Sequence, residues 1–474
     1  MTISVLDKMK SGELARLNPT VPDSKKEERA TSILLATFRV VPDFARAMLS
    51  EAGVSVPKRA RIECYTEVAL EIPGSNRAVR PDGLIIVTSG KKEWFALVES
   101  KTGSSLLKQD QCEDYLTLAK QLGIDAVITI SNQYSAVPSH HPVTVPKGKT
   151  RKVGLFHFSW LSLMSKATLL IESREVDDPE QAFLLNELVR FLKHPSSGVS
   201  SFARMSKGWS LLCGSVKQGA SLRKKDPAIA EAVLSWHQLV RFLALELTAS
   251  VSQPVKVHLT RKHTKDPGSR VADDIDSVIS TSLLISELSV PNAASSLVAI
   301  ADLRRRTLNL AMNLRAPTDR KRPTASINWL LRQLKSVERE DLLIRATWPK
   351  RLRNTTGSIS SVRDDPTCLI HDGVRELPQS FEVIRVIDMA GKFSGVKTFV
   401  ESAIAEVPLF YKDVGERLRA WVPPPPKLKR EKGTEQEQEL DSDVAAPSEP
   451  EIKEFQPSPS EDLSEFPGAA TKTE

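Results

Sequence analysis

Two short apolar segments separated by a glycine-containing turn constrain this chain most. Residues 80–88 (RPDGLIIVT) and 93–101 (EWFALVESK) are rich in strand-forming residues, and the SGKK tetrapeptide between them predicts a tight hairpin. If the turn is centred on the middle of that tetrapeptide, residues pair outward from it, and Asp82 faces Glu99. Their Cβ atoms are then expected about 5 Å apart across neighbouring strands.

Lys101 extends this pair into a group that can carry chemistry. It lies two residues after Glu99, so the strand period of two places it on the same face. Two carboxylates can bind one Mg²⁺ or Mn²⁺ ion, which polarises a phosphoryl group and activates water. The lysine can stabilise the charge of the transition state. The hairpin therefore predicts metal-dependent phosphodiester hydrolysis.

A solvated hairpin edge is the plainer alternative for the same residues. Against it, Glu99 follows the apolar run FALV and Asp82 precedes LIIV, apart from one glycine. A carboxylate with no functional role would be costly to bury there.

The hairpin lies within an ordered succession of elements over residues 24–135. Apolar residues at helical spacing predict a first helix that Ser24 caps and that continues to Val41. The remaining elements expected are strands at 61–72, 80–88 and 93–101, an amphipathic helix at 105–122 and a buried strand at 124–131.

Pro81-Asp82, followed by Glu99-Ser100-Lys101, resembles the PD-(D/E)xK nuclease superfamily of restriction enzymes, Holliday-junction resolvases and repair exonucleases. Gln111 and Tyr115, four residues apart on one helical face, are similar to the QxxxY motif of its RecB-like branch. The resemblance covers about a quarter of the chain. It implies a restriction-endonuclease-like α/β core of helix-strand-strand-strand-helix-strand order and a Mg²⁺- or Mn²⁺-dependent deoxyribonuclease. Repair or defence against foreign DNA is the role that analogy suggests.

The resemblance also implies roles for individual residues. The metal ligands that it implies are Asp82, Glu99 and the backbone carbonyl of Ser100. The catalytic group that it implies is Asp82, Glu99, Lys101, Gln111, Tyr115 and a glutamate near the first helix. Glu28 is our first choice for that glutamate, with Glu27 and the strand residue Glu67 as alternatives. The rival hypothesis is a catalytically silent nuclease fold that binds nucleic acid or serves as a scaffold.

Charge is unevenly distributed along the chain. Residues 423–474 hold six Lys/Arg against thirteen Asp/Glu, a net charge of −7, so residues 1–422 carry about +14. A body this basic suits a polyanionic partner, which we expect to be DNA rather than RNA. The tail has too few apolar residues to offset its ordering entropy, and we expect it to be disordered.

Residues 301–353 are the most basic part of that body, with fourteen Lys/Arg and five Asp/Glu. We expect phosphate contacts, which are salt-dependent and sequence-independent. The residues predicted to make them are Arg304, Arg305, Arg306, Arg320, Lys321, Arg322, Arg332 and Lys335. The first three are expected on or beside a strand. Trp329 and Trp348 could stack on bases or belong to the core, and a solvated basic surface is the alternative for the whole segment.

The chain is thus expected to form a nuclease-like α/β domain, a second mixed α/β or α+β domain and an acidic tail. The predicted boundaries are 1–23 for an N-terminal extension, 24–195 for the nuclease-like domain, 196–225 for a linker, 226–422 for the basic region and 423–474 for the tail. Strands in the basic region are expected near 255–260, 281–290, 297–314, 341–348 and 381–388, with helices at 228–248, 324–336 and 394–420.

Several other classes of protein are disfavoured. The N-terminus lacks a signal-peptide core, and no run approaches 18 apolar residues, so neither export nor a membrane span is expected. The segment near Trp236–Leu247 is expected to be a buried helix. The four cysteines form no CxxC pair, and no P-loop motif occurs. We expect a cytoplasmic protein whose partners are nucleic acid and either a further protein or a second copy.

Overall fold

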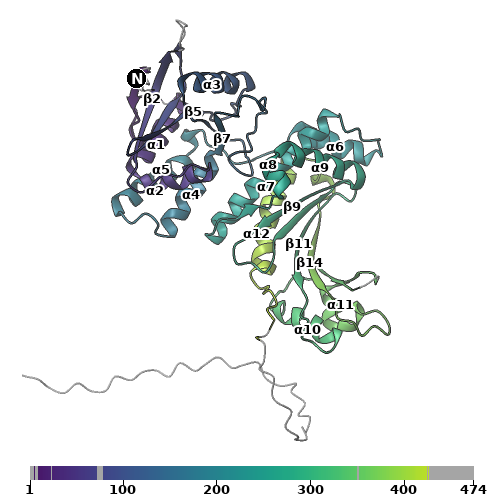
Figure 1. Cartoon of the computed structure of the whole chain (residues 1–474). Helices are drawn as coiled ribbons and strands as arrows, with labels where there is room; N and C mark the ends of the chain where they lie inside the picture. Colours follow the sequence, from purple (N-terminus) through teal and green to yellow (C-terminus); the bar gives the residue numbers. More distant parts are fainter. Residues whose placement is uncertain are drawn as a thin grey trace, which may run out of the picture. The chain divides into compact units, whose positions relative to one another are not determined.

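The computed structural model of the chain describes residues 5, 9–22, 24–71, 78–349, 352–423 and 425. Within these residues the chain is mixed α/β, with two seven-stranded sheets and twelve α-helices (Figure 1). The predicted disordered tail lies outside the described residues, apart from Pro423 and Pro425. The predicted N-terminal extension is described only in part, and that part contains a strand.

The first sheet combines antiparallel and parallel pairing. Its order is β1-β2-β4-β5-β6-β7, with β3 pairing with β2. Strands β1, β2, β4 and β5 pair antiparallel, whereas β5-β6 and β6-β7 are parallel. The strands are β1 (Met9–Leu14), β2 (Arg61–Glu71), β3 (Ala78–Val79), β4 (Gly83–Ser89), β5 (Lys92–Ser100), β6 (Ala126–Ser131) and β7 (Gly154–Ser159).

Helices cover both faces of this sheet, so it forms the middle of three layers. One face packs on four helices, α1 (Lys26–Val40), α2 (Pro42–Glu51), α4 (Trp160–Glu172) and α5 (Pro179–Lys193). The other face packs on α3 (Gln109–Leu122). The apolar alternation of β5 divides between the faces: Ala96 and Val98 face α1, whereas Phe95 and Leu97 face α3. Glu99 and Lys101 therefore follow on the α3 side.

The second sheet is antiparallel throughout, in the order β13-β12-β14-β11-β10-β9-β8. Its strands are β8 (Lys256–Val257), β9 (Leu283–Ser289), β10 (Leu297–Asp302), β11 (Thr307–Arg315), β12 (Leu342–Thr347), β13 (Thr355–Ser358) and β14 (Ser380–Asp388). The helices of this part are α6 (Lys207–Lys217), α7 (Pro227–Val251), α8 (Arg261–Lys265), α9 (Pro267–Thr281), α10 (Pro323–Gln333), α11 (Ile359–Asp364) and α12 (Thr398–Phe410). A single turn of π-helix, Tyr411–Gly415, continues α12.

Residues 196–225 are not the plain linker that their Gly and Ser content predicts. They contain α6, whose Trp209 is fully buried and donates a hydrogen bond of 2.8 Å from Nε1 to the Phe393 carbonyl. Gly208 permits this packing, because a Cβ there would lie 2.6 Å from the Ala228 carbonyl oxygen of α7.

The single strand expected at 297–314 is a hairpin of β10 and β11. Asp302 makes the turn without glycine, because its Oδ1 accepts hydrogen bonds from the N–H groups of Arg304 and Arg305. Arg306 then adopts a φ of 58°, in the left-handed region. The Arg304–Arg306 run therefore lies in a turn beside two strands, as one of the two predicted placements has it, and its side chains do not follow the alternation of a strand.

Helix α7 is the one helix, among the residues that the structure describes, that is long and apolar enough to cross a membrane by length and composition. Most of its large apolar residues, including Trp236 and Phe242, are buried in the core beneath the second sheet, and Leu234 is exposed. This confirms the prediction of a buried helix for the segment.

Candidate active site

The predicted hairpin register is confirmed. β4 and β5 pair from Ser89↔Lys92 at the turn to Gly83↔Val98 at the far end. The next pair outward in this register is Asp82 and Glu99. Both side chains leave the sheet where β4 begins and β5 ends, on the α3 side.

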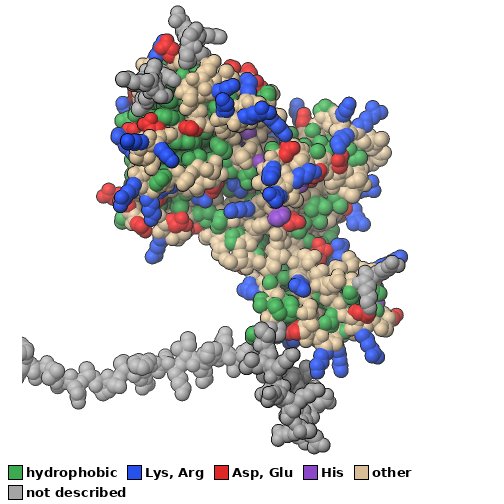
Figure 2. Space-filling view, in the orientation of Figure 1, with side chains coloured by type: hydrophobic (Ala, Val, Ile, Leu, Met, Phe, Trp, Pro, Cys, Tyr) green, Lys and Arg blue, Asp and Glu red, His purple; other side chains and the backbone are tan. Residues whose placement is uncertain are grey.

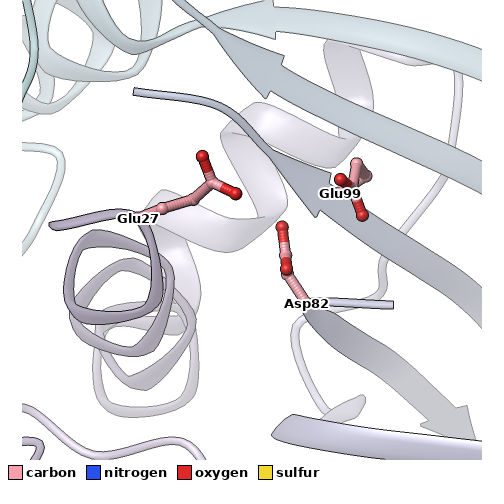
Figure 3. A group of neighbouring side chains, drawn as sticks. All are labelled: Glu27, Asp82 and Glu99. Carbon is pink, nitrogen blue, oxygen red and sulfur yellow. The ribbon is translucent and has the colours of Figure 1, made fainter. Parts of the chain in front are cut away.

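A third carboxylate joins this pair from the first turn of α1. Glu27, Asp82 and Glu99 each offer an oxygen within 4.8 Å of the others. Figure 3 shows the three carboxyl groups turned toward one another, from a helix, the start of one strand and the end of another. No second group of three such ligands occurs in the part of the chain that the structure describes.

Glu28, our first choice for this helix glutamate, is not part of the group. It receives hydrogen bonds of 2.8 Å from Lys25 Nζ at both carboxylate oxygens. Helix α1 begins at Lys26 after Lys25, rather than after a cap at Ser24, and successive side chains point about 100° apart. That phase brings Glu27 into the acid cluster, whereas Glu28 lines the neighbouring cleft with Lys25.

Glu67, the other alternative, is also outside the group. It is exposed on β2 with a φ of 52°, at an irregularity where the pairing with β1 shifts register. This is a β-bulge, which bends an edge rather than directing a side chain into the acid cluster.

Lys101 Nζ lies among the carboxylates. It donates to Glu99 Oε1 at 2.5 Å, to Glu27 Oε1 at 3.0 Å and to the Ser100 carbonyl oxygen at 3.0 Å. Burial disfavours the charged ammonium, but its contacts with Glu99 and then Glu27 raise the pKa of Lys101 above the usual value. Lys101 therefore stays cationic at neutral pH.

Glu99 is held by the two α3 residues that the QxxxY resemblance singled out. Its side chain is only 2% exposed. Gln111 Nε2 donates to Glu99 Oε1 at 2.6 Å, and the Tyr115 hydroxyl donates to Glu99 Oε2 at 2.8 Å. Burial, followed by the charge of Glu99, raises the pKa of Tyr115, so the phenol remains a donor. Both α3 residues touch the acid cluster, as predicted.

Asp82 is fixed by the backbone of the opposite strand. Its Oδ2 accepts hydrogen bonds from the Ser100 N–H at 2.7 Å and the Ser100 hydroxyl at 3.2 Å. Burial and then the charge of Glu99 raise the pKa of Asp82 to about 7, although the Ser100 N–H and Lys101 oppose this rise. The charge of Glu99 therefore raises the pKa of Asp82 more than the charge of Lys101 lowers it.

Three further residues support the site without any motif in the sequence that predicts them. Thr31 and Ser100 exchange a hydrogen bond of 2.5 Å between hydroxyls, which joins α1 to the end of β5. Trp160 Nε1 donates to the Lys101 carbonyl at 2.9 Å. Gly83 lets α1 lie close to β4, since a Cβ there would collide with the Leu35 side chain.

The donor set fits a hard divalent cation. Mg²⁺ and Mn²⁺ prefer oxygen ligands, and three carboxylates with the Ser100 carbonyl supply them in one place. A cleft of about 580 Å³ opens beside Asp82, between β1, the first turn of α1 and β2. Arg16, Lys25 and Arg80 contribute cationic side chains to its walls.

The basic residues predicted to contact phosphate form two separate groups. Arg304, Arg305 and Arg306 are exposed in the turn before β11, and the others lie after its far end, at the start and on the surface of α10. Because β11 has nine residues, the two groups lie about 25–30 Å apart. Figure 2 shows Lys and Arg side chains around the end that carries α10 and α11.

Of the two tryptophans considered for base stacking, Trp348 belongs to the core. It is 2% exposed and donates from Nε1 to the Thr355 hydroxyl at 2.9 Å. Trp329 on α10 is partly buried against the same core.

Comparison with known proteins gives no relative for the chain. No family model matches it, and no curated protein or solved structure is significantly similar to it.

Proposed function

We propose that this chain is a Mg²⁺- or Mn²⁺-dependent nuclease of the PD-(D/E)xK type that acts on DNA. The observation that carries the proposal is the convergence of Glu27, Asp82 and Glu99 on one point beside the Lys101 ammonium. Three acids and a lysine on rigid elements are costly to bring together, and a cation-dependent reaction accounts for them.

Each residue has a role that its contacts support. A bound divalent cation would polarise a phosphoryl group and lower the pKa of a water molecule. Glu27, Asp82, Glu99 and the Ser100 carbonyl would hold the cation. The Lys101 ammonium would stabilise charge on the phosphoryl oxygens during bond breaking.

Gln111 and Tyr115 act on this site through Glu99. Their hydrogen bonds occupy both oxygens of a nearly inaccessible carboxylate and fix its orientation. Such partners of metal ligands commonly affect metal affinity or activity by about ten- to a hundredfold. The QxxxY pair therefore supports the proposal through a contact that the motif alone does not specify.

The proposal includes a restriction-endonuclease-like core for the first sheet. Its support is the succession α1, β2, β4, β5, α3, β6, with α1 and α3 on opposite faces and the acids at one strand end. Helix α2, strand β1 and strand β3 would be additions to that core.

The part built on the second sheet would hold the substrate. Its basic end at α10 offers exposed Lys321, Arg322, Arg332 and Lys335. These residues can contact phosphates without reading bases. They would hold the DNA, and the acid cluster of the first sheet would cleave it.

Cleavage assays test the proposal. Purified full-length protein would be incubated with supercoiled plasmid, linear duplex, single-stranded DNA and an RNA oligonucleotide, with Mg²⁺, Mn²⁺ or EDTA. We expect cation-dependent cleavage of DNA that is lost in both Asp82→Ala and Lys101→Ala. Lys166→Ala is the matched control, because it removes a 2.7 Å lysine–glutamate pair with Glu51 away from the acid cluster.

The outcomes separate the hypotheses. DNA binding without cleavage, equal in wild type and both site variants, would favour the catalytically silent alternative. Cleavage of RNA alone would keep the chemistry and overturn the substrate. Neither binding nor cleavage would leave only a scaffold.

A further inference from the structure

Lys101 Nζ lies among oxygens of the proposed cation site. Its three contacts, to Glu27 Oε1, Glu99 Oε1 and the Ser100 carbonyl, lie at 3.0, 2.5 and 3.0 Å. An ammonium has three donors, so these contacts use all of them. The oxygens that it takes belong to the residues proposed to hold the divalent cation.

An ammonium and a divalent cation compete for these oxygens. Mg²⁺–oxygen distances are about 2.0–2.1 Å, so a cation bound to the same three oxygens would lie within a few ångströms of Nζ. Two positive charges that close repel strongly in a site where Glu99 is nearly inaccessible to water. One of them has to leave.

The side chain of Lys101 can leave while its backbone stays. The Lys101 N–H donates to the Ile130 carbonyl at 2.7 Å in the neighbouring strand, and its own carbonyl accepts from Trp160 Nε1 at 2.9 Å. The backbone is thus held on both sides. The four-carbon side chain turns about its own torsions, and no strand has to move.

We infer that Lys101 is a tethered counter-cation that holds Glu27 and Glu99 together in the metal-free protein and must swing out before a divalent cation binds. The inference rests on the proposed function in one respect, which is that the cation binds among these acids. It adds that metal binding and Lys101 release are coupled. The same lysine that completes the active site lowers its affinity for metal.

The coupling has a measurable size. When only a fraction of molecules is competent to bind, the apparent dissociation constant rises by the inverse of that fraction. Minor conformers typically make up about 0.1–10% of a population. Removing the ammonium should therefore tighten Mn²⁺ binding by about tenfold or more.

The test compares Mn²⁺ affinity and cleavage in wild type and Lys101→Met, by titration calorimetry and DNA cleavage. Methionine keeps an unbranched side chain and removes the charge. We expect tighter Mn²⁺ binding together with loss of cleavage. Lys166→Met, which removes the partly buried ammonium that pairs with Glu51 at 2.7 Å, should change neither.

Three results would count against the inference or its basis. Equal or weaker Mn²⁺ binding in Lys101→Met, with normal binding in wild type, overturns the inference and leaves the metal site intact. Absence of Mn²⁺ binding in both proteins overturns the metal site and the inference with it. A gain of affinity in Lys166→Met equal to that in Lys101→Met would show a general charge effect and also overturn the inference.

A second measurement covers the case in which Lys101→Met fails to fold. The wild-type protein would be made with lysine labelled with ¹³C at Cε and ¹⁵N at Nζ, and the Lys101 signal assigned by its loss in Lys101→Arg. Titration with Mg²⁺ should move the Lys101 signal and leave that of Lys166 in place. A Lys101 signal unchanged at saturating Mg²⁺ would overturn the inference.

Discussion

The Asp82 carboxylate accepts a hydrogen bond of 2.7 Å from the backbone N–H of Ser100. This bond joins the residue before β4 to the last residue of β5, where the hairpin register has already placed Asp82 opposite Glu99. Asp82 is thereby held by main chain rather than by a flexible partner. The acid cluster is built on a strand pair, and only Glu27 is supplied from elsewhere.

Glu27 should matter far more than its neighbour Glu28. Glu27→Gln removes a charge from the acid cluster, whereas Glu28→Gln removes one end of a surface pair with Lys25. We expect Glu27→Gln to weaken Mn²⁺ binding by about tenfold or more, measured by calorimetry. Glu28→Gln should stay within about twofold of wild type, as expected for a surface pair. Equal losses in the two variants would refute the helix phase described for α1.

Tyr115→Phe should impair the site through Glu99. The change removes the donor to Glu99 Oε2 and leaves a buried carboxylate with fewer hydrogen bonds. We expect a fall of about tenfold in cleavage rate and about 1–2 kcal/mol in the free energy of unfolding. Tyr134→Phe is the control, since its hydroxyl donates to the Ser200 carbonyl at 3.3 Å and has no contact with Glu99 in the structure. An unchanged rate in Tyr115→Phe would show that the Tyr115 hydrogen bond to Glu99 has no role in cleavage.

A buried histidine, His157, and a partly buried one, His141, should make the protein less stable in mild acid. Thr129 Oγ1 lies 2.8 Å from His141 Nε2 and 2.9 Å from His157 Nδ1. Burial lowers the pKa of His141 to about 4, and burial with the nearby His141 lowers the pKa of His157 to about 3. His141 lies in the loop before β7, and His157 lies on β7.

The sign of this effect follows from proton uptake. Unfolded histidine takes up a proton near pH 6.5, whereas the folded groups do so only near pH 4 and 3. The unfolded state binds more protons between these values, so the free energy of unfolding falls as pH drops below 6.5. The slope is about 1.4 kcal/mol per pH unit for each histidine.

Urea unfolding at several pH values would measure this slope. His157→Gln should make it shallower, and His258→Gln, a change at an exposed position, should not. An identical slope in wild type and His157→Gln would contradict the assignment to this pair.

The two basic groups should contribute unequally to DNA binding. Arg304 Nε donates to the Ser282 hydroxyl at 3.1 Å, and Arg305 Nη1 lies 4.0 Å from Asp302 Oδ2. The arginines of this turn therefore already have partners within the protein. We expect the double variant Arg332→Ala/Lys335→Ala to reduce the slope of log K against log salt by about two. Arg304→Ala/Arg305→Ala should change it less. Fluorescence anisotropy in EDTA measures this slope without cleavage. A larger reduction of the slope in Arg304→Ala/Arg305→Ala than in Arg332→Ala/Lys335→Ala would place the DNA contact at the turn.

The hairpin could be predicted from sequence because its pairing depends on local chemistry. A tight turn and two apolar strands fix the register, and the register fixes which side chains meet. Gln111 and Tyr115 could be placed for the same kind of reason, since four residues nearly complete one helical turn.

The choice between Glu27 and Glu28 depended on where α1 begins, and the sequence around Ser24 does not determine that. One residue of error turns a helical side chain by about 100°. Helix α6 and strand β1 depended on partners far along the chain, namely the Phe393 carbonyl that accepts from Trp209, and β2. The hairpin of β10 and β11 was hidden because Asp302 replaces the glycine that a turn usually shows.

The proposed metal site is tested most directly by the rate of Mg²⁺-dependent DNA cleavage by Asp82→Asn, compared with that of wild type. Asparagine keeps the shape of the side chain and an oxygen that can accept from the Ser100 N–H, and it removes the charge that would hold the cation. We predict cation-dependent cleavage by wild type and a loss of about a hundredfold or more in the variant. The free energy of unfolding should be unchanged or higher in the variant, because repulsion from Glu99 is relieved. Cleavage by Asp82→Asn at the wild-type rate, or cleavage by wild type that persists in EDTA, would contradict the proposed metal site.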